Sequence, residues 1–168
     1  MEAYFDNSAT TVVTESVKDI VVKAMTEDYG NPSSMHMIGV NAEKYVKTAK
    51  ENIAKILKVD VGEIYFTSGG TEGNNMAIIG SANANKRAGN RVITTKIEHS
   101  SVANPMKYLE KQGFDVVYLP VDNNGIVDME VLKKEMTKDT ILVSMMMVNN
   151  EIGSVLDIEG IGKTIKEY

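Results

Sequence analysis

The sequence contains no cysteine and only two histidines among its 168 residues. Without cysteine, these residues offer no disulfide, no zinc–thiolate site and no cysteine nucleophile. The histidines, His36 and His99, lie far apart and have no carboxylate at metal-ligand spacing, so we expect no metal site. Proline is scarce at three residues, while 43% hydrophobic and 24% charged residues are typical of a globular chain rather than a disordered one.

Runs of basic residues and long apolar segments are also missing. Lysine and arginine are dispersed and the formal net charge is −5, which argues against a nucleic-acid or acidic-membrane surface. The longest apolar segment, residues 141–148, has the length of a strand and is too short to span a membrane. The first residues lack the charged-then-apolar layout of a signal peptide. We therefore expect a cytoplasmic protein with no nucleic-acid or membrane partner.

Two helices are predicted at the start of the chain. Apolar residues recur with helical spacing from Val17 to Met25, after Thr14, a good N-cap residue. A second helical face covers residues 42–57. Between them, residues 29–34 have the glycine, asparagine and proline of a loop.

From residue 64 onward, predicted strands and helices alternate. The helices are expected near residues 71–87, 101–112 and 128–136, and the strands at 64–67, 92–95, 116–119 and 141–148. This alternation predicts an α/β fold in which a mostly parallel sheet is covered by helices. We expect one domain over residues 1–168, with a helical N-terminal segment over about 1–60.

A last helical stripe is formed by Ile158, Ile161 and Ile165, and Tyr168 follows without the further strand that the alternation predicts. We therefore expect an incomplete domain that is part of a longer protein. The alternative is a naturally short chain whose last helix frays.

A glycine-rich turn over residues 68–75 is the first segment that indicates a ligand. Backbone N–H groups at the start of a helix have no partners within it, and the helix dipole adds positive potential there. Glycines let the backbone approach a ligand closely, and Ser68 and Thr71 add hydroxyl donors, which together make a phosphate cup. The alternative is an ordinary helix start capped by Ser68 or Thr71.

Two further polar clusters follow predicted strands, at residues 96–101 and 149–153. Because ligands of parallel sheets bind beyond the carboxyl ends of the strands, all three clusters are expected at one edge. Each has a structural alternative: His99 as a packed neighbour of a helix cap, and Asn149 and Asn150 as a plain turn. For His36 we favour a scaffolding role in its loop, and residues 6–11 either cap the first helix or border the site.

These polar segments resemble the N-terminal part of cysteine desulfurases of the iron–sulfur-cluster assembly type. Those enzymes belong to the class-V aminotransferase group of pyridoxal-phosphate enzymes. Five motifs occur in order: FDNSATT at 5–11, GNPSS at 30–34 with His36, FTSGGTEGNN at 66–75, EHSSV at 98–102 and VNNEIG at 148–153. The resemblance implies the large, cofactor-binding domain of a fold-type-I pyridoxal-phosphate enzyme.

The resemblance also implies roles for individual residues. Gly70 and Thr71 would hold the cofactor phosphate, and Asn150 would hydrogen-bond the ring hydroxyl oxygen. His99 would stack on the pyridine ring and transfer protons at the substrate. Family members convert L-cysteine to L-alanine and pass sulfur through an enzyme persulfide to an iron–sulfur scaffold or another acceptor protein. A homo-oligomer, in the family a homodimer, is also implied.

The sequence departs from the family pattern in the phosphate cup, and it does not include several of the family's catalytic residues. Gly70 stands where the family usually has alanine, and Gly73 and Asn74 where a small residue and aspartate are common. The family's Schiff-base lysine, persulfide cysteine, pyridine-binding aspartate and substrate-binding arginine come after the matching region. We therefore expect these 168 residues alone to be inactive, to bind pyridoxal phosphate weakly or not at all, and to self-associate.

Other functions are compatible with parts of the pattern. Selenocysteine lyase, or another class-V relative, keeps the cofactor and changes the substrate. A further alternative is a non-catalytic module that binds a phosphate compound, or that pairs with a separate chain completing the fold. A Rossmann nucleotide binder fits less well, because the turn lacks G-x-G-x-x-G spacing and no acidic residue ends the strand predicted at 92–95.

Overall fold

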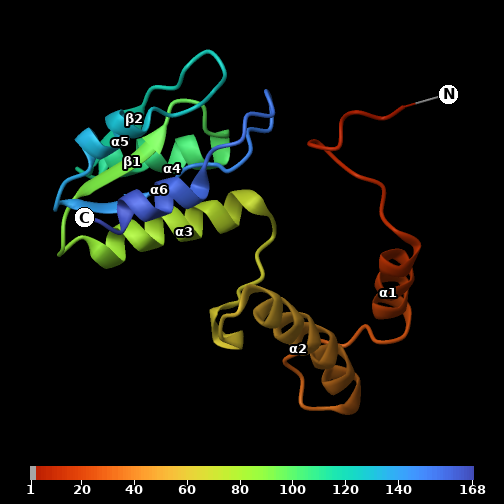
Figure 1. Ribbon diagram of the computed structural model, residues 1–168. Helices are drawn as coiled ribbons and strands as arrows, with labels where there is room; N and C mark the ends of the chain where they lie inside the picture. Colours follow the sequence, from red (N-terminus) through yellow and green to blue (C-terminus); the bar gives the residue numbers. More distant parts are fainter. Residues whose placement is uncertain (1–2) are drawn as a thin grey trace. The chain divides into compact units, whose positions relative to one another are not determined.

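The computed structural model describes residues 3–168, and the chain separates into two compact units, divided after Phe66. The first unit contains the helices α1 (Glu15–Thr26) and α2 (Met37–Leu57), followed by the short 3-10 helix η1 (Val61–Glu63) (Figure 1). Both helices predicted for this part of the chain are confirmed, and α1 begins after Thr14 as expected. The single domain over residues 1–168 stays a prediction.

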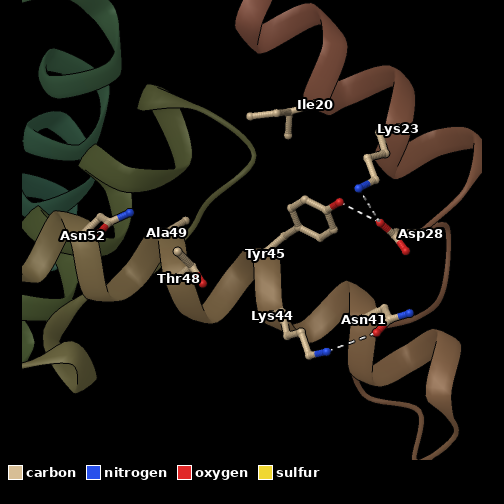
Figure 2. Close-up of a pocket in the computed structure, with 9 residues that line it drawn as sticks. All are labelled: Ile20, Lys23, Asp28, Asn41, Lys44, Tyr45, Thr48, Ala49 and Asn52. Atoms are coloured by element: carbon tan, nitrogen blue, oxygen red, sulfur yellow. Dashed lines mark hydrogen bonds and ion pairs between the residues drawn. The ribbon is translucent and has the colours of Figure 1, made fainter.

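Polar contacts organise the first unit. His36 precedes α2 and caps it, because its Nδ1 accepts a hydrogen bond from the Gly39 backbone N–H at 3.3 Å. A cavity of about 750 Å3 is lined by residues of α1 and α2, and Figure 2 shows the Tyr45 hydroxyl directed at Asp28 inside it. That hydroxyl donates to Asp28 Oδ2 at 2.6 Å, a bond that raises the pKa of Tyr45, and Lys23 Nζ lies 4.0 Å from the same oxygen. Tyr45, Asp28 and Lys23 are thus paired with one another in this cavity.

A parallel sheet forms the centre of the second unit. Its strands β1 (Arg91–Thr95), β2 (Asp115–Leu119) and β3 (Thr140–Val143) are arranged in the order β2-β1-β3, and both pairings are parallel. The helices of this unit are α3 (Gly70–Asn85), α4 (Ser100–Lys111), α5 (Met129–Glu135) and α6 (Ile158–Ile165). The predicted α/β fold, with a parallel sheet covered by helices, is confirmed.

Alternating residues of the sheet divide the core of this unit between two faces. Val92 packs with buried residues of α3 and α4, namely Ile78, Ala82, Val102, Met106 and Leu109. The next residue, Ile93, packs on the other face with Leu132 of α5, with Met136 just after that helix, and with Ile161 of α6. Each large apolar side chain buried in this way contributes about 1.5–3 kcal/mol. The two helical layers therefore fix the central strand between them.

One predicted strand, at residues 64–67, is wrong. Ile64 is buried, but the side chains of Tyr65 and Phe66 are 70% and 54% exposed, and the segment has no strand geometry. Apolar and aromatic residues form a strand only where a neighbouring strand supplies hydrogen bonds. Local residue type alone therefore misidentified this segment.

The predicted strand at residues 141–148 is shorter than expected, since β3 ends at Val143. Ser144 N still donates to Ile93 O at 2.9 Å, but the next bonds leave the sheet. Met146 N donates at 3.1 Å to Oε1 of Glu98, and Val148 forms an isolated antiparallel bridge with Val155. A side-chain carboxylate has taken the place of the neighbouring strand, which turns the chain away from the sheet.

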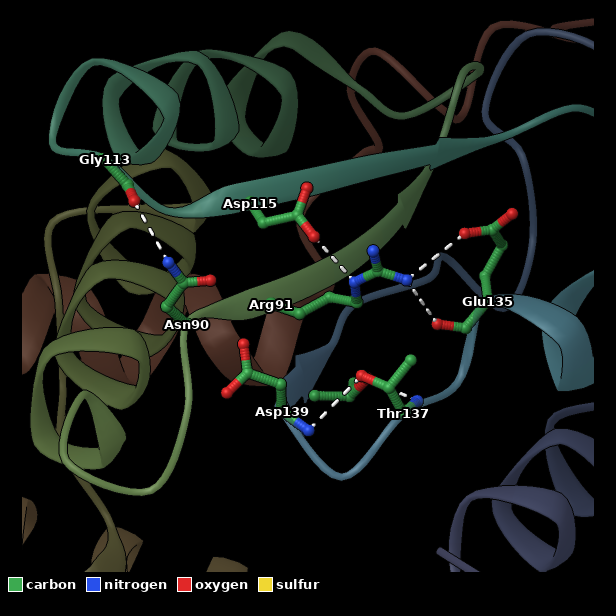
Figure 3. A network of polar contacts seen from close by, with 8 residues as sticks. Asn90, Arg91, Gly113, Asp115, Glu135, Thr137 and Asp139 are labelled. Carbon is green, nitrogen blue, oxygen red and sulfur yellow. Dashed lines mark hydrogen bonds and ion pairs between the residues drawn. The ribbon is translucent and has the colours of Figure 1, made fainter.

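Charged groups hold the amino ends of the strands together (Figure 3). Arg91 Nε lies 2.7 Å from Asp115 Oδ2 at the start of β2, and Arg91 Nη1 donates to the Glu135 backbone oxygen at 3.0 Å. The same Nη1 lies 3.4 Å from Glu135 Oε2, so that one guanidinium links β1, β2 and the end of α5. A planar guanidinium with several donors is well suited to such a three-way link.

Candidate functional site

The glycine-rich turn leads directly into α3. Gly69 is the N-cap residue, and no side chain among residues 3–168 caps this helix. Cβ atoms placed on Gly69 and Gly70 would meet nothing within 4 Å, so the start of the helix is open to a ligand. The first-turn N–H groups and the helix dipole together favour an anion here. The alternative of a helix start capped by Ser68 or Thr71 does not describe this structure.

Glu72 occupies part of the donor set of the turn. Its Oε2 accepts from the Ser68 backbone N–H at 2.6 Å and from the Ser68 hydroxyl at 2.7 Å. These two bonds lower the pKa of Glu72, because they stabilise the ionised carboxylate. The Ser68 hydroxyl is therefore engaged, whereas the Thr71 hydroxyl has no hydrogen-bond partner within the described part of the chain. Of the two hydroxyls expected for the cup, only that of Thr71 is available to a ligand.

His99 lies at the start of α4, just after β1. It is the N-cap residue, and its Nδ1 accepts from the Ser101 backbone N–H at 3.1 Å. The Ser101 hydroxyl oxygen lies 2.8 Å from the same nitrogen. His99 is thus the cap of α4 itself rather than a packed neighbour of the cap, and it is exposed at the carboxyl edge of the sheet.

Asn149 and Asn150 have different surroundings although they are adjacent. Asn149 is 5% exposed, donates to the Ile97 backbone oxygen at 3.0 Å and accepts from the N–H groups of Glu151 and Ile152 at 2.9 and 3.0 Å. Asn150 is exposed, and its Nδ2 donates to Glu151 Oε1 at 2.7 Å. Asn149 therefore holds the turn together, and Asn150 faces solvent at the edge.

Hydrogen bonds bring the three polar clusters to one edge of the second unit. Asn74 in α3 donates from Nδ2 to Ser101 Oγ at 2.8 Å, which links the glycine-rich turn to the His99 segment. The Asn149 bond to Ile97 links that segment to the third cluster. The first cluster reaches this edge through α3, without the strand that was predicted before it.

The sequence did not indicate that Asn74, Ser101 and Asn149 join the three clusters. Ser101 is 6% exposed and Asn149 is 5% exposed. Buried polar side chains need partners, and here those partners come from other segments of the chain. Their positions in polar motifs were visible in the sequence, but their pairing was not.

Other kinds of site receive no support from the described residues. Across residues 3–168, no group of three or more metal-binding side chains comes together. Over the same residues, no helix combines the length and apolarity that crossing a bilayer requires. The cavity of the first unit is lined by none of the residues predicted for ligand binding.

Comparison with known proteins identifies the family. A family model described as aminotransferase class-V matches residues 3–168, and the chain therefore belongs to the class-V aminotransferases.

Several relatives of the chain are named cysteine desulfurase. The cysteine desulfurase IscS of Clostridium botulinum (strain Hall) is 46% identical over 166 residues, which cover 99% of this chain and 42% of that protein. The IscS of Dictyoglomus turgidum is 47% identical over 167 residues, with the same coverage of 99% and 42%. The chain thus spans about 42% of the length of these curated relatives.

Solved structures give the same relationship. A NifS-like protein superimposes with a TM-score of 0.93 at 41% identity, over 99% of this chain and 46% of its own. SspA in complex with cysteine has a TM-score of 0.89 at 36% identity, over 98% of this chain and 47% of its own. DndA from Streptomyces lividans follows with 0.83 at 36% identity, over 98% and 46%. The resemblance stated from the motifs is confirmed.

Proposed function

We propose that residues 67–168 form the cofactor-binding part of a pyridoxal-phosphate-dependent cysteine desulfurase. One observation carries the proposal. The uncapped start of α3, the exposed His99 and the turn that contains Asn150 all lie at one edge of the sheet. Support also comes from relatives named cysteine desulfurase at 46–47% identity. The proposed substrate is L-cysteine, consistent with the name of one structural neighbour, SspA in complex with cysteine.

The donors of the turn fit a phosphate group. Gly70 and Thr71 would hold it, with backbone N–H groups at the helix start and the Thr71 hydroxyl as donors. An anion at a helix N-terminus gains about 0.3–1 kcal/mol from the dipole at an exposed position. Glu72 lies beside this turn, but its charge is directed toward Ser68 by two hydrogen bonds. The cup therefore presents its remaining donors to the phosphate.

The ring contacts would come from His99 and Asn150. His99 would lie against the pyridine face and hold or move a proton at Nε2, because Nδ1 is engaged by Ser101. The Asn150 amide would donate to the ring hydroxyl oxygen, exchanging its bond to Glu151 for that contact. When bound, pyridoxal phosphate supplies the electron sink that allows bonds at the substrate Cα and Cβ to break.

The sulfur acceptor must be a thiol outside these 168 residues, because they contain no cysteine. In the proposed reaction the carbon–sulfur bond of L-cysteine breaks, L-alanine is formed and the acceptor thiol becomes a persulfide. An iron–sulfur scaffold or another sulfur-acceptor protein is the proposed protein partner, and the proposed assembly is a homo-oligomer. For the 168-residue chain alone, weak cofactor binding and no turnover are our expectation.

Ligand binding tests the proposal without turnover. We would titrate the chain with 4′-deoxypyridoxine 5′-phosphate, which lacks the aldehyde and so does not react with surface lysines, and follow its phosphorus NMR signal. Thr71→Ala should weaken binding by about tenfold to a hundredfold, because a hydrogen bond to a charged group contributes roughly 1.5–3 kcal/mol and about 1.4 kcal/mol corresponds to a factor of ten. Thr26→Ala, in α1, is the matched control and should leave the affinity unchanged.

Two results would contradict the proposal. If 4′-deoxypyridoxine, which lacks the phosphate, displaces the bound 5′-phosphate as well as an equal concentration of unbound 5′-phosphate would, the cup does not hold phosphate; the displacement is read from the phosphorus signal of the 5′-phosphate. Equal effects of Thr71→Ala and Thr26→Ala would remove Thr71 from the site.

A further inference from the structure

The Ser101 hydroxyl is a buried group that connects α3 to the His99 ring. It accepts from Asn74 Nδ2 and lies 2.8 Å from His99 Nδ1, while Ser101 itself is 6% exposed. We propose that Ser101 and Asn74 are positioning residues that hold His99 in the tautomer protonated at Nε2. For its ligand this inference rests on the proposed function, but the tautomer is a property of the chain itself.

The first reason is the backbone N–H of Ser101. It points at His99 Nδ1 over 3.1 Å, and a backbone N–H is a donor in every protonation state. Nδ1 must therefore accept, and a neutral imidazole that accepts at one nitrogen carries its proton on the other. The ring is thus left with an N–H at Nε2.

The second reason is the direction of the Ser101 hydroxyl. A hydroxyl has one proton and two lone pairs. The Asn74 amide donates to Oγ, so a lone pair is used on that side and the hydroxyl proton is free to point at Nδ1. Asn74 thus donates to Ser101, and Ser101 donates to His99. This second donor at Nδ1 favours the same tautomer as the backbone N–H, the one protonated at Nε2. Because Ser101 is buried, bulk water competes little for this hydroxyl.

The consequence concerns the part of the ring that meets a ligand. The hydrogen bonds among residues 3–168 leave His99 Nε2 without a partner, and the ring is exposed. Nε2 is therefore the one ring position at which His99 donates to, or exchanges a proton with, a bound molecule. Ser101 and Asn74 do not take part in that exchange, and they act by fixing the orientation and tautomer of the ring.

Nitrogen NMR of the imidazole rings reads the tautomer directly. The chain is labelled with 15N at histidine, and its two histidines give two sets of ring signals. A His36→Asn variant assigns them, since asparagine keeps a good cap at the start of α2. At a pH where both rings are neutral, His99 should show an unprotonated-type signal for Nδ1 and a protonated-type signal for Nε2.

Two variants test the donor chain. Asn74→Asp replaces the donor with an acceptor, so the Ser101 proton turns to the carboxylate and the population protonated at Nδ1 should rise. Ser101→Ala leaves only the backbone donor, and the tautomer ratio should fall about fivefold, as expected for the loss of a bond of about 1 kcal/mol. Asn83→Asp, an exposed position of α3, makes the same charge change and should leave the His99 signals in place.

The outcomes separate this inference from the proposed function. Signals averaged between the tautomers in the wild type, or identical spectra for Asn74→Asp and Asn83→Asp, would overturn the positioning role. If the tautomer is fixed but 4′-deoxypyridoxine 5′-phosphate fails to bind, the positioning role stands and the proposed function fails. If the analogue binds through Thr71 but the His99 tautomer is not fixed, the proposed function stands and the positioning role fails.

Discussion

The two ends of the parallel sheet in the second unit differ in what their polar groups do. At the amino ends, Arg91 is paired with Asp115 and Glu135, so the charged groups satisfy one another. At the carboxyl ends, the start of α3 is uncapped, and among the described residues the Thr71 hydroxyl and His99 Nε2 have no partner. One end of the sheet uses its polar groups for stability, while the other keeps several of them available for a ligand.

Within the carboxyl edge, Asn149 is the exception to this contrast, and replacing it should have the largest effect on stability. Asn149→Ala removes one donor bond and two acceptor bonds of a buried side chain, leaving the Ile97 oxygen and two N–H groups without partners. We expect a loss of about 3 kcal/mol, since each buried unpaired group costs roughly 1–3 kcal/mol and water can reach some of them. Urea unfolding followed by circular dichroism measures it.

Asn150→Ala is the matched control one residue further along. Asn150 is exposed with a single side-chain bond to Glu151, so its loss should change stability by only about 0.5 kcal/mol or less. It should instead weaken the binding of 4′-deoxypyridoxine 5′-phosphate, which retains the ring hydroxyl. If the two variants lose equal stability, the division between a structural and a ligand-facing asparagine is wrong.

At the amino edge, Arg91→Met should lower stability and leave ligand binding unchanged. The methionine keeps part of the apolar stem but removes three contacts of the guanidinium, to the Asp115 carboxylate and to the backbone and side chain of Glu135. The ion pairs are partly exposed, so we expect a loss of about 1–2 kcal/mol rather than the larger cost of breaking a buried pair.

The control for this change is Arg87→Met, at an exposed position that forms no ion pair within residues 3–168. Its unfolding midpoint should match the wild type. A drop in analogue affinity for Arg91→Met with an unchanged unfolding midpoint would reverse the assignment of the two edges.

The difference between the edges also explains what could be predicted from the sequence. Helices α1 to α6 and the core strands correspond to helices and strands predicted from apolar patterns, which a single sequence displays directly. The motifs placed Gly70, Thr71, His99 and Asn150 at one edge, and their roles stay predictions. The strand at 64–67 was wrong because strand formation depends on a neighbour that local composition does not reveal.

The hydrogen bonds between the motifs could not be predicted for a related reason. Asn74 and Ser101 are far apart in the sequence, and their contact depends on how α3 and α4 pack. The same is true of Glu98, whose carboxylate ends β3 by accepting from Met146 N. Side-chain pairing between segments is a result of the tertiary fold, whereas motif composition is a property of the chain.

Two buried hydroxyls near the carboxyl ends of the strands have no hydrogen-bond partner among residues 3–168, unlike the paired charged groups at the amino ends. Thr94 and Tyr118 are register partners in β1 and β2, and within the described chain neither hydroxyl oxygen has a hydrogen-bond partner. Burial, together with the nearby Glu110 carboxylate, raises the pKa of Tyr118 to about 12. A raised folded-state pKa means that the folded protein holds this proton more tightly than the unfolded chain, whose tyrosine titrates near pH 10.

The titration of Tyr118 should therefore leave stability unchanged below about pH 10 and lower it as the pH rises from 10 toward 12, because the unfolded chain loses this proton first. Tyr118→Phe removes both the unpaired hydroxyl and the titration. We expect it to raise stability at neutral pH by about 1 kcal/mol, because an unsatisfied buried hydroxyl is replaced by an apolar edge of similar shape.

Tyr108→Phe, at a residue that is 45% exposed, is the control. Unfolding midpoints of the two variants, measured from pH 8 to 12, should diverge increasingly above pH 10, and parallel curves would show that the Tyr118 hydroxyl is solvated rather than unpaired.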